Sequence, residues 1–562
     1  MRWRYLTLVG FFLLSFFAIS AKLFYWQIIE GQSLSALAQS QYGQVVTLTP
    51  QRGEIETSDS FPIAANRLSY LVFANPKEIK NPSETAQLLS PILKVDSASI
   101  SALLSLNKFW VSLKPDATAQ QRSDVTHLDL PGIGFQETYT RFYPEASMAA
   151  QLLGFVGKDE NGNSQGYFGI EGYYDRQLRG RPGYATQIHD ALGHPILSQI
   201  NTDSGEEDGR TLVLTVNRAM QYLVEQKLKD AIQKYGADSG MVGVMDPKTG
   251  GILAMSSYPS FDQRDYSSFD TSLYKNPFIT NTYEPGSTFK PLIMSSAFDS
   301  GLLKPDSICP ICGGPVQVAN YLIQTWNDKH FPNENMMDII KNSDNDGMIY
   351  VSQVLGRDKM LSYINNFGMG QVTGIDLEGE VAPYLPDKSY WQPIDLATAS
   401  FGQGISVTPI EILDAFSAIA NDGVRMQPHV ISQIITPEGQ TIPIDPKILS
   451  QPISPEAAKV MTQILVYTVD KGEASFARLK GYRIAGKTGT ASVAVAGHYD
   501  SSQTIASFVG FAPADNPKFV MLVILNHPTA SIYGSETAAP VFFDIAQSLL
   551  NYYGIGPTPG LE

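Results

Sequence analysis

The hydrophobic pattern of the chain begins with its longest apolar segment, at the amino terminus. Residues Tyr5–Ala21 contain no charged side chain, and apolar residues continue beyond Lys22. A helix that crosses a bilayer needs about 20 mostly apolar residues, and the basic residues Arg2 and Arg4 favour a cytoplasmic amino end. We therefore predict a cytoplasmic stub and a single membrane anchor within residues 1–30, with a cleavable signal peptide as the alternative. Either interpretation places the rest of the chain outside the cytoplasm.

From residue 31 to residue 205 the pattern changes to short strand-like runs that alternate with turns and polar stretches. This region contains no constellation of catalytic side chains. We expect 31–205 to form a mixed α+β pedestal, or dimerisation-like, domain that holds the next domain away from the membrane and meets partners. The polar, glycine-containing segment 204–210 is the candidate linker that follows it.

The third region, 206–553, alternates predicted strands and helices. Residues 219–235 carry apolar side chains at helical spacing. The apolar runs 505–512 and 519–525, separated by a gap with Pro, Asp and Asn, predict two strands of a hairpin-like meander. Together these patterns predict an α/β (α+β) domain. The last residues, 554–562, are rich in Gly and Pro and are expected to form a disordered tail.

Composition narrows the function classes. The formal net charge of −15 argues against a nucleic-acid partner, and the hydrophobic content of 43% is enough for buried cores. The two cysteines, Cys309 and Cys312, could form a local disulfide outside the cytoplasm. A redox centre would need a thioredoxin-like βαβ setting, and a structural zinc site would need four ligands. The sequence therefore predicts neither a metal nor a cofactor.

The first candidate for chemistry is Ser287, which begins the motif Ser287-Thr288-Phe289-Lys290 between a Pro-Gly turn and an apolar, helix-like run. Lys290 then lies one helical turn away on the same face, at about 5–6 Å between Cβ atoms. A serine hydroxyl needs an adjacent base to act as a nucleophile, and burial beside another cation lowers the pKa of a lysine toward that role. The same spacing at Ser105 and Ser272 lacks this context and indicates ordinary surface positions.

Two further motifs follow in order. Ser343-Asp344-Asn345 lies between two apolar segments, and we expect it to be a short connection between two helices. Lys487-Thr488-Gly489-Thr490 lies in a predicted strand, where the lysine offers positive charge and the threonine hydroxyls can hydrogen-bond a carboxylate. Its glycine lets a substrate backbone approach closely. A second Lys-Thr-Gly at 248–250 is predicted to be a hairpin turn instead.

These three motifs, in this order, resemble the signature of penicillin-binding proteins and class A β-lactamases. Further segments extend the resemblance to nearly the whole length of a class B penicillin-binding protein. They are Arg52–Ile55, Arg141–Pro144, Gly169–Glu171 and Leu178–Gly180 for its pedestal, and Phe401–Gly404, Thr408–Pro409 and Ala538–Phe542 for its transpeptidase domain. The form Tyr283–Ser287 is similar to the division-type subgroup. One departure is Glu56–Phe61, where the family usually continues with an Asp-Arg-Asn-Gly-like turn.

The resemblance implies a monofunctional peptidoglycan D,D-transpeptidase with a central antiparallel sheet flanked by helices. Its substrates would be peptidoglycan stem peptides and the lipid-linked precursor, and β-lactams would acylate the same serine, Ser287. Its expected partners are a membrane glycosyltransferase that polymerises the glycan and other proteins of cell-wall synthesis, with a role at division.

The resemblance also implies a role for each motif residue. Lys290 would accept the proton of Ser287, and Ser343 would relay a proton to the leaving D-Ala under the influence of Lys487. Asn345 would bind the substrate amide, and the strand residues Thr488, Gly489 and Thr490 would bind the substrate and its terminal carboxylate. The backbone N–H groups of Ser287 and Thr490 would hold the oxyanion.

Three alternatives remain open at this point. A β-lactamase also acylates such a serine but must deacylate rapidly with water, and the chain has no Glu-x-x-Leu-Asn stretch of the class A deacylation kind. A D,D-carboxypeptidase shares the motifs and differs in the acceptor of the acyl group. A non-catalytic scaffold or β-lactam sensor would be expected to carry a broken motif, and all three motifs are intact.

Overall fold

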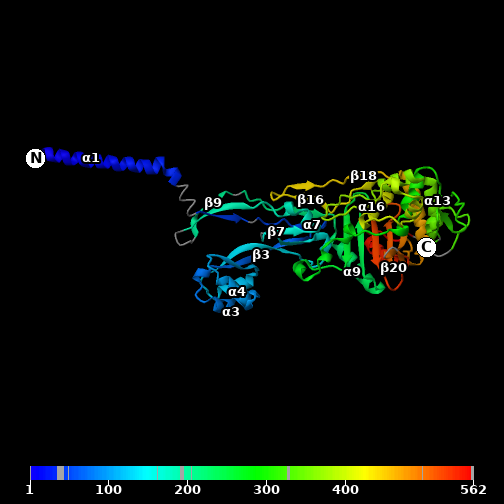
Figure 1. The fold of residues 1–562 in the computed structure, drawn as a ribbon, viewed down its shortest axis with the longest axis horizontal. Helices are drawn as coiled ribbons and strands as arrows, with labels where there is room; N and C mark the ends of the chain where they lie inside the picture. The colour runs from blue at the N-terminus through cyan, green and yellow to red at the C-terminus, as the bar shows by residue number, and fades with distance from the viewer. Residues whose placement is uncertain are drawn as a thin grey trace. The chain divides into compact units, whose positions relative to one another are not determined.

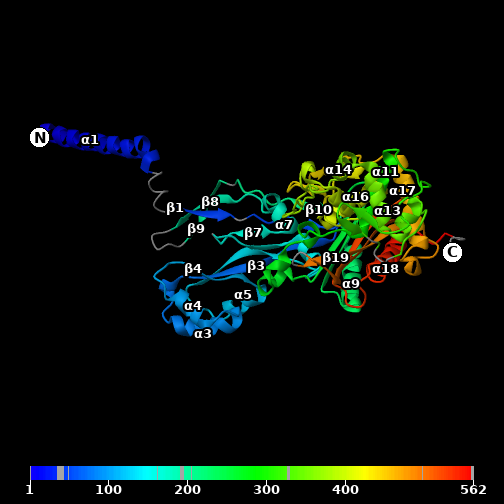
Figure 2. The same cartoon turned by 45° about the vertical axis from the view of Figure 1, so that its right-hand side comes forward.

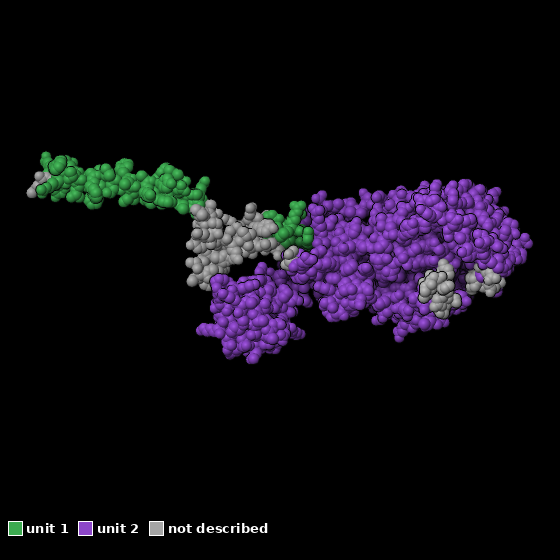
Figure 3. Space-filling view, in the orientation of Figure 1, with its two compact units in different colours: residues 1–52, 179–209 green, residues 53–178, 210–562 purple. Residues whose placement is uncertain are grey.

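The computed structural model describes residues 2–34, 43–48, 50–160, 162–189, 195–203, 205–323, 325, 329–495 and 498–558 of the 562-residue chain. The chain divides into two compact units, coloured in Figure 3. Unit 1 comprises residues 1–52 and 179–209, and unit 2 comprises residues 53–178 and 210–562. Ser204, at the start of the predicted linker, lies outside the described residues.

Unit 1 contains the predicted anchor. Helix α1 (Arg2–Phe24) continues into the π-helical turn η1 (Tyr25–Ile29), and neither has a buried residue. Within the described residues this is the one helix long and apolar enough to cross a membrane. The rest of unit 1 includes an antiparallel sheet with the strand order β1-β8-β9, made of β1 (Gly43–Leu48), β8 (Gly183–His189) and β9 (Pro195–Asp203).

The amino-terminal part of unit 2 is built on a seven-stranded sheet in which β17-β16-β10-β2-β3-β4 are neighbours and β5 also pairs with β3. Its strands are β2 (Ile55–Glu56), β3 (Pro62–Ala74), β4 (Val111–Ala117), β5 (Ile133–Phe142), β10 (Thr211–Leu214), β16 (Ile431–Ile435) and β17 (Thr441–Pro443). Helices α3 (Pro82–Leu93), α4 (Ser97–Leu104) and α5 (Ala119–Thr126) share a hydrophobic core with β3 and β4. Figure 1 shows α3 and α4 on one side of β3. The strands come from both sides of the predicted linker, so this sheet joins the pedestal region to the carboxyl-terminal region.

Two segments of the pedestal that are far from Arg141 in sequence, at Gly53 and Glu171, contact its buried side chain. Its Nε forms an ion pair with Glu171 Oε1 at 2.6 Å, and its Nη1 donates to the carbonyl oxygen of Gly53 at 2.7 Å. The hydroxyl of Tyr143 donates to the same carboxylate at 3.4 Å, and Gly53 N donates to Leu178 O at 2.7 Å. A buried ion pair is favourable only when further hydrogen bonds satisfy it. Gly53 O satisfies Nη1 of Arg141, whereas Nη2 is buried without a hydrogen-bond partner within the described residues.

The part of unit 2 that carries the three motifs is called the catalytic half here. It is centred on a five-stranded antiparallel sheet with the order β12-β11-β21-β20-β19, which confirms the predicted central antiparallel sheet. The strands are β11 (Ser239–Met245), β12 (Ile252–Tyr258), β19 (Ala485–Val495), β20 (His498–Ala512) and β21 (Phe519–Asn526). Successive residues of β21, such as Leu522 and Val523, belong to two different core clusters. Since successive side chains of a strand point to opposite faces, the sheet is buried on both faces, and its central strands are continuous apolar runs.

Helices cover both faces of this sheet (Figure 2). One face packs against α9 (Arg218–Tyr235) and α18 (Ala538–Tyr552). The other face packs against a helical layer that includes α11 (Lys290–Asp299), α12 (Met336–Asn342), α13 (Asn345–Leu355), α16 (Pro409–Ala420) and α17 (Pro455–Lys471). All residues of α16 are buried, so this layer forms the centre of the catalytic half.

Shorter elements complete unit 2. They are η2 (Pro76–Glu78), α6 (Ala150–Leu153), β6 (Phe155–Lys158), β7 (Ser164–Tyr167), α7 (Gly169–Tyr173), α8 (Asp175–Leu178), η3 (Gln263–Ser268), η4 (Thr271–Tyr274), α10 (Pro277–Thr280), η5 (Gly286–Thr288), β13 (Val316–Val318), β14 (Tyr321–Ile323), α14 (Arg357–Asn366), η6 (Lys388–Tyr390), α15 (Pro393–Ser400), β15 (Arg425–Met426), β18 (Ile448–Ser450) and η7 (Ser475–Ala477).

The start of the predicted disordered tail is packed against the protein. Ile555 lies against the core cluster that contains α18. The backbone N–H of Thr558 donates to Gly481 O at 2.7 Å. Residues 555 and 558 of the predicted tail thus have contacts with the rest of unit 2, and the last four residues lie outside the described part of the chain.

Candidate active site

Ser287 lies in the short 3₁₀ turn η5, directly before the α-helix that begins at Lys290. The turn is fixed from behind, because Gly286 N donates to Gly402 O at 2.9 Å. Gly402 has a φ of +81°, and a Cβ there would overlap the carbonyl oxygen of Gly286. The Phe401–Gly404 segment therefore supports the turn that presents Ser287.

Lys290 joins the first motif to the second. Its side chain is fully buried, and its Nζ donates to Ser343 O at 2.6 Å and to Asn345 Oδ1 at 2.8 Å. The same Nζ lies 3.3 Å from Ser343 Oγ, which donates to Ser287 Oγ at 2.8 Å. A continuous hydrogen-bonded path thus connects the amine of Lys290 to the hydroxyl of Ser287.

The second motif is the predicted connection between two helices, and it is as short as such a connection can be. Ser343 ends α12 in the left-handed conformation, with a φ of +56°. Asp344 is the N-cap of α13 and accepts hydrogen bonds from Asp346 N and Gly347 N at 3.1 and 3.2 Å. An N-cap carboxylate stabilises a helix start, so Asp344 holds the backbone that aims its two neighbours at Lys290.

The third motif is on strand β19, as predicted, and it packs on the turn that carries Ser287. A Cβ on Gly489 would overlap Ser507 Oγ and would lie 2.8 Å from Thr288 Cγ2. Lys487 is buried, and its Nζ donates to Thr488 Oγ1 at 3.0 Å. The hydroxyl of Thr490 accepts from Gly534 N at 3.0 Å. The structure therefore brings all eight predicted site residues to one place, at the junction of η5, the α12–α13 connection and β19.

Burial lowers the pKa of both lysines of the site. Burial, followed by the positive charge of Lys487, lowers the pKa of Lys290 to about 7, although nearby carboxylates oppose this shift. Burial also lowers the pKa of Lys487, and the negative charge of Glu473 opposes that shift. A lysine with a pKa near neutrality is partly unprotonated at physiological pH and can accept a proton.

The site contains acidic residues that motif reasoning missed. Burial, with the charge of Asp344, raises the pKa of Glu334 to about 8. Burial likewise raises the pKa of Asp346 to about 6, although His330 Nδ1 lies 2.9 Å from its carboxylate. Glu473 Oε2 accepts a hydrogen bond from Thr488 Oγ1 at 3.3 Å. Glu334 and Glu473 belong to no motif, so the sequence carried no signal for either of them.

One acidic group of the site has the spacing of a metal site but not its chemistry. Cys312, Glu334 and Asp344 can bring ligand atoms within 4.8 Å of one another. Cys312 is bonded to Cys309 in a disulfide. A cysteine binds metals as a thiolate, so these three residues do not fit a metal ion.

The repeated patterns elsewhere in the chain lie in other settings. Ser105 is the exposed C-cap of α4, and its hydroxyl donates to Ser101 O at 2.8 Å. Ser272 lies in the short helix η4. Lys248 lies in the turn between β11 and β12, as predicted. None of these three residues has a hydrogen bond or ion pair to a motif residue among the contacts of the described chain.

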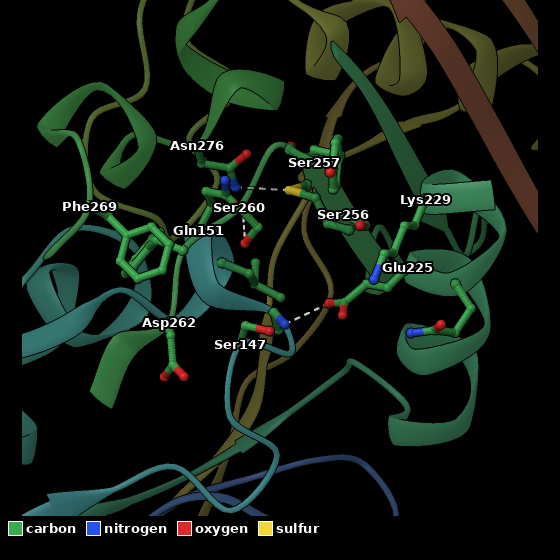
Figure 4. A pocket seen from close by; sticks show the side chains of 16 residues that line it. Ser147, Gln151, Glu225, Lys229, Ser256, Ser257, Ser260, Asp262, Phe269 and Asn276 are labelled. Carbon is green, nitrogen blue, oxygen red and sulfur yellow. Dashed lines mark hydrogen bonds between the residues drawn. The ribbon is translucent and has the colours of Figure 1, made fainter. Parts of the chain in front are cut away.

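A separate cavity of about 300 Å³ lies against β12, at the edge of the sheet opposite β19 (Figure 4). Glu225 accepts a hydrogen bond there from Ala149 N at 2.6 Å, and Gln151 Nε2 donates to Pro259 O at 2.9 Å. No residue of the three motifs lines this cavity. It marks the junction between a pedestal segment and the catalytic half, and it is distinct from the candidate active site.

Comparison with known families agrees with this geometry. The family described as "Penicillin binding protein transpeptidase domain" matches residues 240–547. The family described as "Penicillin-binding Protein dimerisation domain" matches residues 47–214.

Individual relatives match over nearly the full chain. "Stage V sporulation protein D" of Bacillus subtilis is 33% identical over 99% of this chain and 86% of that protein. "Peptidoglycan D,D-transpeptidase FtsI" of Escherichia coli is 28% identical over 99% of this chain and 92% of that protein.

Solved structures share the fold. A peptidoglycan synthetase from Bifidobacterium adolescentis has 27% identity and a TM-score of 0.74, covering 92% of this chain and 98% of its own. Penicillin binding protein 3 from Mycobacterium tuberculosis, solved in complex with aztreonam, has 24% identity and a TM-score of 0.72, covering 92% of this chain and 99% of its own. The chain belongs to the class B penicillin-binding proteins, with a transpeptidase domain preceded by a dimerisation domain.

Proposed function

We propose that this protein is a membrane-anchored peptidoglycan D,D-transpeptidase that works through an acyl-enzyme on Ser287. The observation that carries the proposal is the hydrogen-bonded path from buried Lys290 through Ser343 to Ser287. Two of the relatives support the same activity, because one is a peptidoglycan D,D-transpeptidase and another a probable one.

The acylation step uses the lysine as a base. Ser287 Oγ attacks the carbonyl carbon of the penultimate D-Ala, while its proton moves to Lys290 Nζ, directly or through Ser343 Oγ. The backbone N–H groups of Ser287 and Thr490 would hold the negative oxygen of the tetrahedral intermediate. When the carbon–nitrogen bond breaks, the proton returns through Ser343 to the leaving amine of the terminal D-Ala. An ester between Ser287 and the stem peptide remains.

Transfer repeats these steps in reverse with a new nucleophile. An amine of a neighbouring stem peptide attacks the ester, loses its proton to the same relay and releases Ser287. In this scheme Asn345 binds the substrate amide. The β19 residues Thr488, Gly489 and Thr490 bind the substrate along the strand, with Lys487 close to its terminal carboxylate. A β-lactam would acylate Ser287 by the same route and would remain attached for longer.

We also propose the organisation of the protein around the membrane. The basic residues before α1 favour a cytoplasmic amino end, which leaves the catalytic half outside the cytoplasm. The proposed division is an anchor in 1–30, a pedestal in 31–205 and a catalytic domain in 206–553. A membrane glycosyltransferase would supply the glycan chain, because the described residues contain no second catalytic constellation. A function at division is consistent with the similarity to FtsI.

The experiment that tests this function follows the acyl acceptor. The full-length protein in detergent is mixed with lipid-linked precursor and a glycan-polymerising partner, and the digested product is analysed by mass spectrometry. We expect D,D-cross-linked muropeptide dimers with the wild-type protein and none with Ser287→Ala or after penicillin treatment. Release of terminal D-Ala without any dimers would contradict transpeptidation and favour the carboxypeptidase alternative.

A further inference from the structure

Glu473 lies beside the third motif, in a position that is electrostatically unfavourable for an acidic residue. It follows Gly472, the C-cap of α17, at the helix end where carbonyl groups already concentrate negative charge. One of its oxygens, Oε2, accepts from Thr488 Oγ1. The other, Oε1, is buried and has no hydrogen-bond partner within the described residues. A carboxylate in this position needs a nearby positive charge to stabilise it.

That charge is Lys487, and a threonine hydroxyl connects the two groups. Lys487 Nζ donates to Thr488 Oγ1 at 3.0 Å, and Thr488 Oγ1 donates its single proton to Glu473 Oε2 at 3.3 Å. The hydroxyl is therefore oriented from both sides. The bond to Glu473 is long for a hydrogen bond, so an incoming carboxylate can replace Glu473 as the acceptor while the hydroxyl keeps its contact with Lys487.

We propose that Glu473 is a positioning residue for the acylation reaction: its carboxylate keeps Lys487 an ammonium ion and aims the hydroxyl of Thr488. This inference rests on the proposed function. It adds a negatively charged residue to the motif residues. In this arrangement buried Lys290 is neutral and acts as the base, and buried Lys487 stays positively charged.

The surrounding charges are consistent with this arrangement. The charge of Lys487 lowers the pKa of Lys290, and the charges of Asp344, Glu473 and Glu334 raise it. For Lys487, in contrast, burial lowers the pKa and the charge of Glu473 opposes this shift. Asp346 interacts electrostatically with Lys290, and its carboxylate is paired with His330 Nδ1 at 2.9 Å. Removing the charge of Glu473 therefore removes a charge that favours the protonated form of Lys487.

The sign of the effect follows directly. Without the negative charge, the pKa of Lys487 falls, and Lys487 loses its proton at a lower pH. The alkaline limb of the acylation rate then moves to lower pH. The acidic limb does not move to higher pH, because Glu473 itself raises the pKa of Lys290.

The test measures the second-order rate of acylation by a fluorescent penicillin between about pH 5.5 and 10, with the full-length protein in detergent. Glu473→Gln keeps the shape of the side chain and removes its charge. Glu473→Asp keeps the charge and guards against a folding defect of the first variant. Glu456→Gln is the matched control, because Glu456 lies exposed in the first turn of the same helix. Thermal unfolding of each variant is recorded in parallel.

We expect the alkaline limb of Glu473→Gln to move by about one pH unit to lower pH, which is a tenfold change in proton affinity. Glu473→Asp should restore most of this shift, and Glu456→Gln should match the wild type. An unchanged profile, a loss of rate by the same factor at every pH, or an Asp variant that behaves like the Gln variant would each overturn the inference. Failure of the wild-type protein to be labelled at Ser287 would instead overturn the proposed function, and this inference with it.

Discussion

The environment of a single side chain, Lys290, determines whether the serine beside it can act as a nucleophile. Its amine is fully buried and donates to oxygens of the second motif. With Ser343 Oγ donating to Ser287, Lys290 Nζ donates to three oxygens, which is the pattern of the protonated amine. Loss of one proton leaves two donors for Ser343 O and Asn345 Oδ1 and a lone pair toward Ser343 Oγ. Burial and Lys487 together lower its pKa to about 7, which makes the neutral form available at physiological pH.

Acylation should therefore depend on pH through Lys290. The neutral fraction of a base with a pKa of about 7 falls roughly tenfold per pH unit below that value and is nearly complete above it. We expect the rate of acylation by a fluorescent penicillin to rise between pH 5.5 and 7.5 and then to level off before the alkaline decline. Stopped-time gel fluorescence gives this rate. A rate that keeps rising toward the ordinary lysine pKa of about 10.4 would show that Lys290 is not the base.

At the level of single residues, the motif residues could be predicted from the sequence. The acidic residues outside the motifs that shift the pKa of the two motif lysines could not. Ser287, Lys290, Ser343 and Lys487 have recognisable spacing and flanking patterns. Glu334 and Glu473 influence the pKa of Lys290 only because folding brings them close to the motifs. The raised pKa of Glu334 depends on burial and on Asp344, which no local pattern encodes.

Among the elements, strand β19 and the turn η5 pack closely against each other beside the nucleophile. Gly489 allows this contact, because a side chain there would meet Ser507 on the neighbouring strand and Thr288 in the turn that carries the nucleophile. The loop around Gly402 supports the same turn from the other side through the Gly286–Gly402 hydrogen bond. The turn is thus held between a strand and a loop, and small changes in either should displace Ser287.

Gly489→Ala should separate the strand from the turn and reduce acylation. Overpacking of this kind costs about 1–3 kcal/mol of stability, and a displacement of the nucleophile on the order of 1 Å can lower its rate roughly 100-fold. The acylation rate and the thermal midpoint are measured together. Gly314→Ala is the matched control, because a Cβ at Gly314 would meet nothing within 4 Å. Equal acylation rates for the two variants would contradict the proposed role of this contact.

Most elements of the catalytic half were predictable from the sequence, and their assembly was not. The β20–β21 meander, helix α9 and the turn at Lys248 agree with their predicted positions. The position of β10 was not predictable, because β10 lies outside the central sheet and pairs with β2 and β16. Periodicity identifies a strand, whereas the choice of partner strand depends on contacts between residues far apart in the sequence.

For the whole molecule, the pedestal and the catalytic half of unit 2 are tied together by a shared sheet and by buried polar contacts. Strands from residues 55 to 74 and from 431 to 443 belong to one sheet. The buried pair Arg141–Glu171, with the hydrogen bond to Gly53 O, connects three pedestal segments. The division into anchor, pedestal and catalytic regions could be proposed from composition and motifs. The connections between them depend on long-range pairing that the sequence pattern does not specify.

The most direct test of the account is the position and lifetime of the penicillin adduct on the intact protein. The full-length chain is treated with penicillin, digested and mapped by mass spectrometry. The account predicts one penicilloyl group on the peptide that contains Ser287, stable over minutes, and no adduct in Ser287→Ala. An adduct on another serine, persistent labelling of Ser287→Ala, or hydrolysis of the adduct within seconds would contradict a transpeptidase that acts through Ser287.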